Sequence, residues 1–109
     1  MEGKVLPPVI GTTIKIAVAA ELGKDIHMVD VNFSCVVYNN AIKSNSITLQ
    51  KSDMIYVEDD LYLAVVDTSN IGTGEYYIRF SADIPDSDCV GGIRKEIVTI
   101  PTGIKVNYR

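Results

Sequence analysis

Apolar and polar side chains alternate along most of this chain, and clusters of Gly, Asp, Asn, Ser and Pro interrupt the alternation. A repeat of two residues is typical of β-strands that turn one face toward a core. The alternation predicts strands at residues 13–20, 29–37, 47–49, 54–57, 61–66, 76–84, 94–100 and 104–108. Short strands separated by turns at such regular spacing predict an all-β fold, an antiparallel sandwich of seven or eight strands.

The same alternation predicts which side chains face the core. In residues 61–66 we expect the core face to carry Leu61, Leu63 and Val65, and therefore Tyr62 to point outward. In residues 76–84 the even-numbered positions should point inward. The predicted core contains Ile16, Val31, Phe33, Leu63, Val65, Ile78, Phe80 and Val98.

Two prolines limit the last strands. Pro85 should end the strand before it, since proline has no N–H to donate to a sheet. Pro101 interrupts what would otherwise be one long terminal strand. A bulge or a change of sheet near residues 101–103 is therefore expected.

The chain of 109 residues fits one domain, with a sandwich at residues 13–109 and an extended arm at residues 1–12. Pro7, Pro8 and Gly11 make the arm unsuited to a packed strand. Its apolar part is exposed unless something covers it, so we predict an interface there. An arm folded back on its own domain is the alternative. The predicted interface residues are Lys4, Val5, Leu6, Pro7, Pro8, Val9 and Ile10.

Charge and composition argue against several classes of partner. The net charge is −4 and no run of Lys and Arg occurs, which disfavours binding to nucleic acid. No apolar run approaches the roughly 18 residues of a membrane span. The first residues lack the apolar segment of a secretory signal, so we expect neither a membrane partner nor secretion.

Catalytic groups are sparse. His27 is the single histidine, and no nucleophile motif surrounds any Ser or Cys. Cys35 falls on a predicted core face, where a thiol is inert. Cys89 lies in a loop rather than in a strand after a tyrosine, so an immunoglobulin-type bridge to Cys35 is not expected. We predict two free thiols, a protein of the reducing cytoplasm and no enzymatic activity.

Acidic turns are the candidate metal ligands, but we predict neither a metal nor a cofactor. Calcium needs six to eight oxygen ligands in a defined loop spacing, and neither cluster has it. Gly72 and Gly74 are turn residues, because no helix follows them to bind a phosphate. The two clusters are Glu58, Asp59 and Asp60, and Asp83, Asp86 and Asp88.

Tyrosines offer a further alternative, an aromatic platform for sugars. Alternation places Tyr76 inward and Tyr77, like Tyr62, on an outer face. Outward tyrosines are also typical of protein interfaces and of half-buried strands. Neither the sugar platform nor the protein interface is preferred over the simplest interpretation, that tyrosine suits half-buried strands.

Residues 65–106 resemble a recurring segment of small β-sandwich proteins from bacteriophages that infect gut Bacteroidales. More loosely, they resemble the immunoglobulin-like modules of phage baseplate and fibre proteins. Cys89 and Val90 depart from the pattern, which has an aromatic residue there. The matching features are Val66-Asp67-Thr68, Gly72 with Gly74, Ile84-Pro85-Asp86 with Asp88, the strand carrying Gly92, Arg94, Glu96, Ile97 and Val98, and Thr102-Gly103-Ile104.

The resemblance implies an immunoglobulin-like sandwich with a structural role in a virion. Such domains serve as head fibres, capsid decorations or baseplate-to-fibre adaptors. It implies a homo-oligomer that contacts other virion proteins, is assembled in the host cytoplasm and ends in the virion. The alternative function is a secreted carbohydrate-binding or adhesion-type module.

Overall fold

The structure, a computed structural model, describes residues 8–108 and folds more than half of them into strands. Short 3-10 turns, and no α-helix, join the strands of this part of the chain. These turns are η1 (Met28–Asp30), η2 (Lys51–Asp53), η3 (Thr68–Asn70) and η4 (Val90–Gly92). The strands are β1 (Thr13–Ala19), β2 (Asn32–Asn39), β3 (Ser46–Gln50), β4 (Ile55–Glu58), β5 (Leu61–Asp67), β6 (Gly74–Pro85) and β7 (Ile93–Val106).

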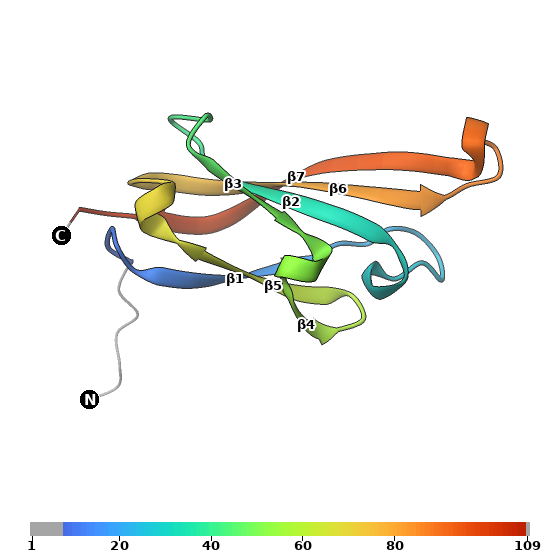
Figure 1. Cartoon of the computed structure of the whole chain (residues 1–109), viewed down its shortest axis with the longest axis horizontal. Coiled ribbons are helices and arrows are strands. Elements are labelled where there is room, and N and C mark those ends of the chain that lie inside the picture. The colour runs from blue at the N-terminus through green and yellow to red at the C-terminus, as the bar shows by residue number, and fades with distance from the viewer. Residues whose placement is uncertain (1–7, 109) are drawn as a thin grey trace.

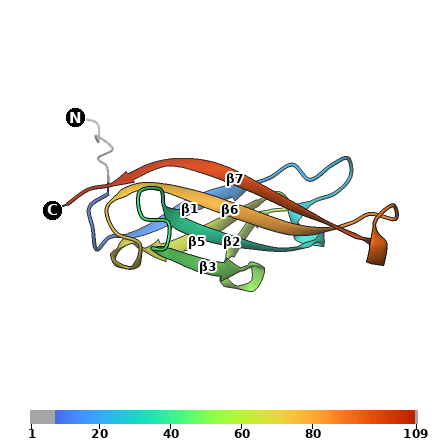
Figure 2. The same cartoon turned by 90° about the horizontal axis from the view of Figure 1, so that it is seen from above.

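The strands form two sheets that pack face to face as two layers (Figure 1). One sheet has the order β1-β5-β4 and the other the order β3-β2-β6-β7. Every strand pair is antiparallel. The view from above shows β7, β6, β2 and β3 side by side over the smaller sheet (Figure 2). The prediction of an all-β fold with two antiparallel sheets is therefore confirmed.

The core lies between the two layers and is built from residues that alternate along the strands. In β2 and β6 the facing follows the sequence pattern, because polar residues mark the outer face of each strand. Phe33 and Phe80 meet at the centre, with ring centroids 5.2 Å apart. The predicted core residues that are buried are Ile16, Val31, Phe33, Ile78 and Phe80.

The predicted facing of β5 is wrong. The buried residues of this strand are Tyr62, Ala64 and Val66, whereas Leu61, Leu63 and Val65 lie on the outer face. Every residue from 61 to 66 is apolar, so both faces of the strand read as core faces in the sequence. The ring of Tyr62 decides between them by packing edge-on against Phe33, 5.0 Å away.

Val98 is a second correction, because it shares the inward face of its neighbour Phe80 and is still 42% exposed. β7 is the edge strand of its sheet. The opposite layer has only three strands and leaves this edge of the larger sheet partly uncovered. Position within the sheet, which the sequence pattern does not encode, exposes Val98.

β7 continues through Pro101 as one strand with a bulge. Opposite it, the pairing shifts between Glu75 and Tyr77. The hydroxyl of Thr102 donates to the Tyr76 carbonyl at 2.6 Å and accepts from the Ile104 N–H at 3.1 Å. Gly103 follows with φ +73°, a conformation that suits glycine at a bulge. The predicted bulge is therefore present, and the strand stays in one sheet.

A set of buried polar groups closes the end of the sandwich where β6 begins. The Tyr76 hydroxyl, at the start of β6, donates to the Gly72 carbonyl at 2.5 Å. The Asn39 amide donates to the Ile71 and Thr73 carbonyls and accepts two backbone N–H groups of the following loop. Thr68 donates to the Thr12 carbonyl and so fixes the entry to β1. These bonds let polar side chains be buried without an unpaired group.

The molecule is elongated, because the β6–β7 hairpin extends beyond the rest of the sandwich (Figure 1). Its extents are 51 × 34 × 20 Å and its radius of gyration is 15.5 Å. A compact chain of this length would have a radius of about 13 Å. Within residues 8–108 no helix has the length and hydropathy required to cross a membrane.

Candidate functional site

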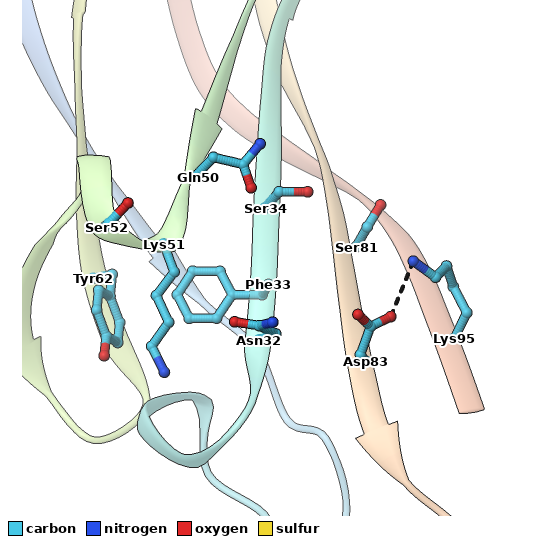
Figure 3. Close-up of a pocket in the computed structure, with 10 residues that line it drawn as sticks. All are labelled: Asn32, Phe33, Ser34, Gln50, Lys51, Ser52, Tyr62, Ser81, Asp83 and Lys95. Carbon is cyan, nitrogen blue, oxygen red and sulfur yellow. Dashed lines mark ion pairs between the residues drawn. The ribbon is translucent and has the colours of Figure 1, made fainter. Parts of the chain in front are cut away.

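An open groove of about 750 Å³ lies where the start of β2 meets η2, the start of β5 and the β6–β7 hairpin (Figure 3). Residues far apart in the sequence form it because the register brings Asn32 opposite Asp83 and Asp83 opposite Lys95. Its lining residues are Asn32, Phe33, Ser34, Gln50, Lys51, Ser52, Tyr62, Ser81, Asp83 and Lys95.

The aromatic side of the groove serves mainly to close the core. Phe33 and Tyr62 are each only 5% exposed, so neither ring offers a face on which a ligand could stack. The Lys51 ammonium attaches η2 to the segment before β2 by donating to the carbonyls of Val29 and Val31, at 2.7 and 2.8 Å. Its ammonium also lies 5.6 Å from the centroid of the Phe33 ring.

The polar side of the groove lies on the outer face of β2 and β6. The register pairs Asn32 with Asp83 and Ser34 with Ser81 on this face. Lys95 donates to an Asp83 oxygen at 3.0 Å, the ion pair drawn in Figure 3. Hydroxyls, an amide and a charged pair can bind a polar ligand by hydrogen bonds, but they include no nucleophile paired with a base.

The first acidic cluster organises two loops. Asp60 accepts from His27 Nδ1 at 2.8 Å and from the Met28 N–H at 3.0 Å. These bonds attach the loop before β2 to the β4–β5 turn. The hydrogen bond with Asp60 raises the pKa of His27, and the same bond, together with that from Met28, lowers the pKa of Asp60. Tyr56 donates to Asp59 at 2.8 Å, and this bond raises the Tyr56 pKa.

The second acidic cluster is divided among different cations. Asp83 binds Lys95, whereas Asp86 accepts from Arg94 Nε at 3.2 Å. Asp86 also accepts from the Asp88 N–H at 3.0 Å and so closes the hairpin turn. In residues 8–108 no three His, Cys, Asp or Glu side chains are grouped so that they could hold a metal ion.

The two cysteines are free, as predicted. Cys35 is buried, and burial raises the pKa of its thiol to about 11. Such a thiol is protonated at neutral pH and therefore a poor nucleophile. Cys89 is partly exposed at the turn of the β6–β7 hairpin.

Of the predicted interface residues, Lys4, Val5, Leu6 and Pro7 lie outside the described residues. Val9 forms an isolated parallel bridge with Asn107, just after β7. The Ile10 N–H donates to the Asn107 carbonyl at 2.8 Å, and the Asn107 N–H donates to the Pro8 carbonyl at 3.0 Å. The described end of the arm thus lies against its own domain.

The free edge of β7 is a feature that the sequence analysis missed. Over residues 93–106 no described strand pairs with this edge, and the bridge between Val9 and Asn107 lies just beyond its end. Ile93 and Ile97 are 54% and 60% exposed on the outer face of the hairpin. The sequence signal for this edge is a strand that carries apolar residues, Ile93 and Ile97, on its outer face. Such a pattern does not distinguish an edge strand from a central strand.

Comparison of the chain with protein-family models, with curated proteins and with solved structures found no match.

Proposed function

We propose that this protein is a non-enzymatic structural protein of a bacteriophage virion, with an immunoglobulin-like fold. In that fold the strand orders are B-E-D in one sheet and C′-C-F-G in the other, apart from strand A. The orders β1-β5-β4 and β3-β2-β6-β7 correspond to these. Tyr76 supports the assignment, because a tyrosine at the start of strand F that bonds to backbone just upstream is a hallmark of the fold.

The role that we propose is assembly or attachment through protein contacts, as a head fibre, a capsid decoration or a baseplate-to-fibre adaptor. The carrying observation is the edge of β7, with which no strand within residues 8–108 pairs, on a projecting hairpin (Figure 1). An edge strand presents N–H and C=O groups on which another chain can add a strand. The proposal places the protein in the virion after assembly in the host cytoplasm, with other virion proteins as partners.

The distal half of β7 is the part best suited to strand addition. Natural edges are protected by proline and by lysine. Pro101 and Lys105 lie in the proximal half, whereas Ile93, Ile97 and Val98 expose apolar side chains in the distal half. Lys95 is held by Asp83 within the same chain, and this ion pair reduces its protective effect. A partner with an extended apolar segment fits this edge.

The arm is the second contact in the proposal. Residues Lys4 to Ile10 are apolar apart from the lysine, and Pro8 to Ile10 lie beside the end of β7. The proposed partner therefore meets the arm and the edge strand on one side of the molecule. Removing residues 1–7 tests the arm while keeping the bonds of Pro8 and Ile10 to Asn107.

The test is incorporation into phage particles. The tagged chain is expressed in infected host cells, and particles are purified by density gradient and analysed by mass spectrometry. Ile97→Asp should abolish incorporation, because it places a charge in the middle of the edge. Val90→Asp is the matched control, because Val90 is fully exposed at the hairpin tip and off the strand. Absence of the parent chain from particles, or equal incorporation of Ile97→Asp, contradicts the proposal.

A carbohydrate-binding or adhesion module is the second candidate, favoured by the polar side of the groove. Asn32, Ser34 and Asp83 could hydrogen-bond sugar hydroxyls. A glycan array followed by calorimetry tests this role. Binding that Asp83→Ala abolishes and Thr48→Ala preserves would support it over the virion role, since Thr48 lies outside the groove on β3.

A further inference from the structure

The small sheet is apolar on both of its faces. Its outer face follows from the register, which places Ala17 and Ile55 on either side of Leu63. Ala17, Ala19 and Ile55 are exposed, and the three β5 residues are partly exposed. The outer apolar face consists of Ala17, Ala19, Ile55, Leu61, Leu63 and Val65.

Among the described residues, no element covers the outer apolar face. The larger sheet packs on the opposite side of β1, β5 and β4 (Figure 1). A central strand with a continuous apolar run is typical of sheets that are buried on both faces. β5 has that sequence, LYLAVV, and is the central strand of its sheet. The outer face of β5 therefore has the composition of a buried face, although no described element packs on it.

Two charges at the border of the outer apolar face, Lys15 and Glu58, are placed so that a copy of the face complements them. Lys15 lies on β1 beside Val65, and Glu58 lies on β4 beside Leu61. Because β1 and β4 flank β5 on opposite sides, these two charges occupy diagonal corners, with Leu63 between them. A two-fold axis that lies in the plane of the face, passes through Leu63 and is perpendicular to the Lys15–Glu58 diagonal sets Leu63 on Leu63 of a second copy. The same axis sets each Lys15 opposite a Glu58.

We propose that the outer apolar face binds a second copy of this chain in a symmetric, face-to-face dimer. Such an interface is self-complementary, so one patch with charges at diagonal corners suffices to form it. The inference does not depend on the virion role. It leaves the β7 edge, on the other sheet, free in each copy for a different partner.

The size of the face sets the strength expected of the dimer. Strands about 4.8 Å apart and rising about 3.3 Å per residue give a face on the order of 300 Å². Standard interfaces bury roughly 800 Å² on each partner. We therefore expect a reversible dimer that forms as the concentration rises through the micromolar range, rather than a permanent one.

Sedimentation equilibrium of the full chain over a range of concentrations tests the proposal. The parent chain should approach twice its mass of 11.9 kDa. Leu63→Lys should remain monomeric at every concentration, with an unchanged circular dichroism spectrum. Thr48→Lys adds the same charge to an exposed site on the other sheet and should still dimerise. A parent chain that stays monomeric, or a Leu63→Lys dimer, overturns the proposal.

A charge exchange tests the partner's identity and does not depend on whether Leu63→Lys folds. Lys15→Glu and Glu58→Lys should each weaken the dimer at least tenfold, because like charges then meet across the axis. The double variant should recover the affinity of the parent chain. Recovery supports a second copy in the proposed orientation, and no recovery contradicts it.

Discussion

Phe80 lies on β6 of the larger sheet, and its side chain points into the core between the two layers. It is fully buried and packs against Phe33. Phe80→Ala should lower the free energy of unfolding by about 3–5 kcal/mol, through lost burial and the cavity that remains. Urea unfolding followed by circular dichroism measures the change.

Val98 provides the internal control for this prediction, because it faces the same way as Phe80 but lies at the sheet edge. Val98→Ala should cost under about 1 kcal/mol, as is usual for an exposed position. If the two substitutions lowered the free energy of unfolding equally, then either Val98 is buried in solution or Phe80 is not buried, and the account of the core would be wrong.

Tyr76 contributes through its hydroxyl as well as its ring. The hydroxyl donates to the Gly72 carbonyl and lies 3.4 Å from that of Thr68. Tyr76→Phe removes the donor and keeps the ring, so it should cost about 0.5–1.5 kcal/mol in unfolding free energy. Tyr77→Phe, on the outer face of the same strand, should cost less. If Tyr77→Phe lowered the free energy of unfolding more than Tyr76→Phe, the Tyr76 hydroxyl would not be what fixes the turn before β6.

The cysteines should differ sharply in reactivity. Cys35 is buried with its pKa raised to about 11, whereas Cys89 is partly exposed. A thiol reagent such as dithionitrobenzoate should therefore modify one thiol in the native protein and two in urea. Cys89→Ser should abolish the native reaction. A rapid native reaction that persists in Cys89→Ser would contradict the position of Cys35.

At the scale of elements, His27 and Asp60 attach the loop before β2 to the β4–β5 hairpin. The pKa of His27 is raised above its ordinary 6.5 and that of Asp60 is lowered below 3.8. The stability due to His27 is complete below pH 6.5 and is lost as pH rises through its raised pKa. The Asp60 part is present above pH 3.8 and is lost as pH falls through its lowered pKa. The attachment is therefore complete between these two ordinary values.

Because His27 is the single histidine, one NMR titration measures this effect. The parent chain should show a His27 pKa above 6.5, and Asp60→Asn should return it toward that value. Asp30→Asn serves as the control, since the Asp30 charge raises the pKa of His27 less than Asp60 does. An unchanged titration in Asp60→Asn would show that the two loops are not joined by this pair.

The same elements show where the sequence predicts structure and where it does not. The facing of β2 and β6 was predicted correctly, since polar residues such as Ser34 and Asp83 mark one face of each strand, although β2 begins at Asn32 rather than at residue 29. In β5 both faces are apolar, so alternation could not identify the core face. The groove could not be predicted, because the β2–β6–β7 register, which no local pattern encodes, brings Asn32, Asp83 and Lys95 together.

At the scale of the whole molecule, the two sheets have different free surfaces. The larger sheet offers the backbone edge of β7, and the smaller sheet offers the outer apolar face. In our proposals the edge binds another virion protein and the face binds a second copy. Together they would let a chain of 109 residues link several neighbours without an active site.

The facing of β5 is the central claim, because both the core and the outer apolar face depend on it. The most direct measurement is the thermal unfolding of two variants with substitutions at adjacent positions, Leu63→Lys and Ala64→Lys. Leu63→Lys should fold with a stability loss within about 1 kcal/mol, since the lysine stem lies along the surface with its charge in water. Ala64 is fully buried, so Ala64→Lys should cost more than about 4 kcal/mol or prevent folding. If the Ala64→Lys variant folds and the Leu63→Lys variant does not, the facing of β5 described here is wrong.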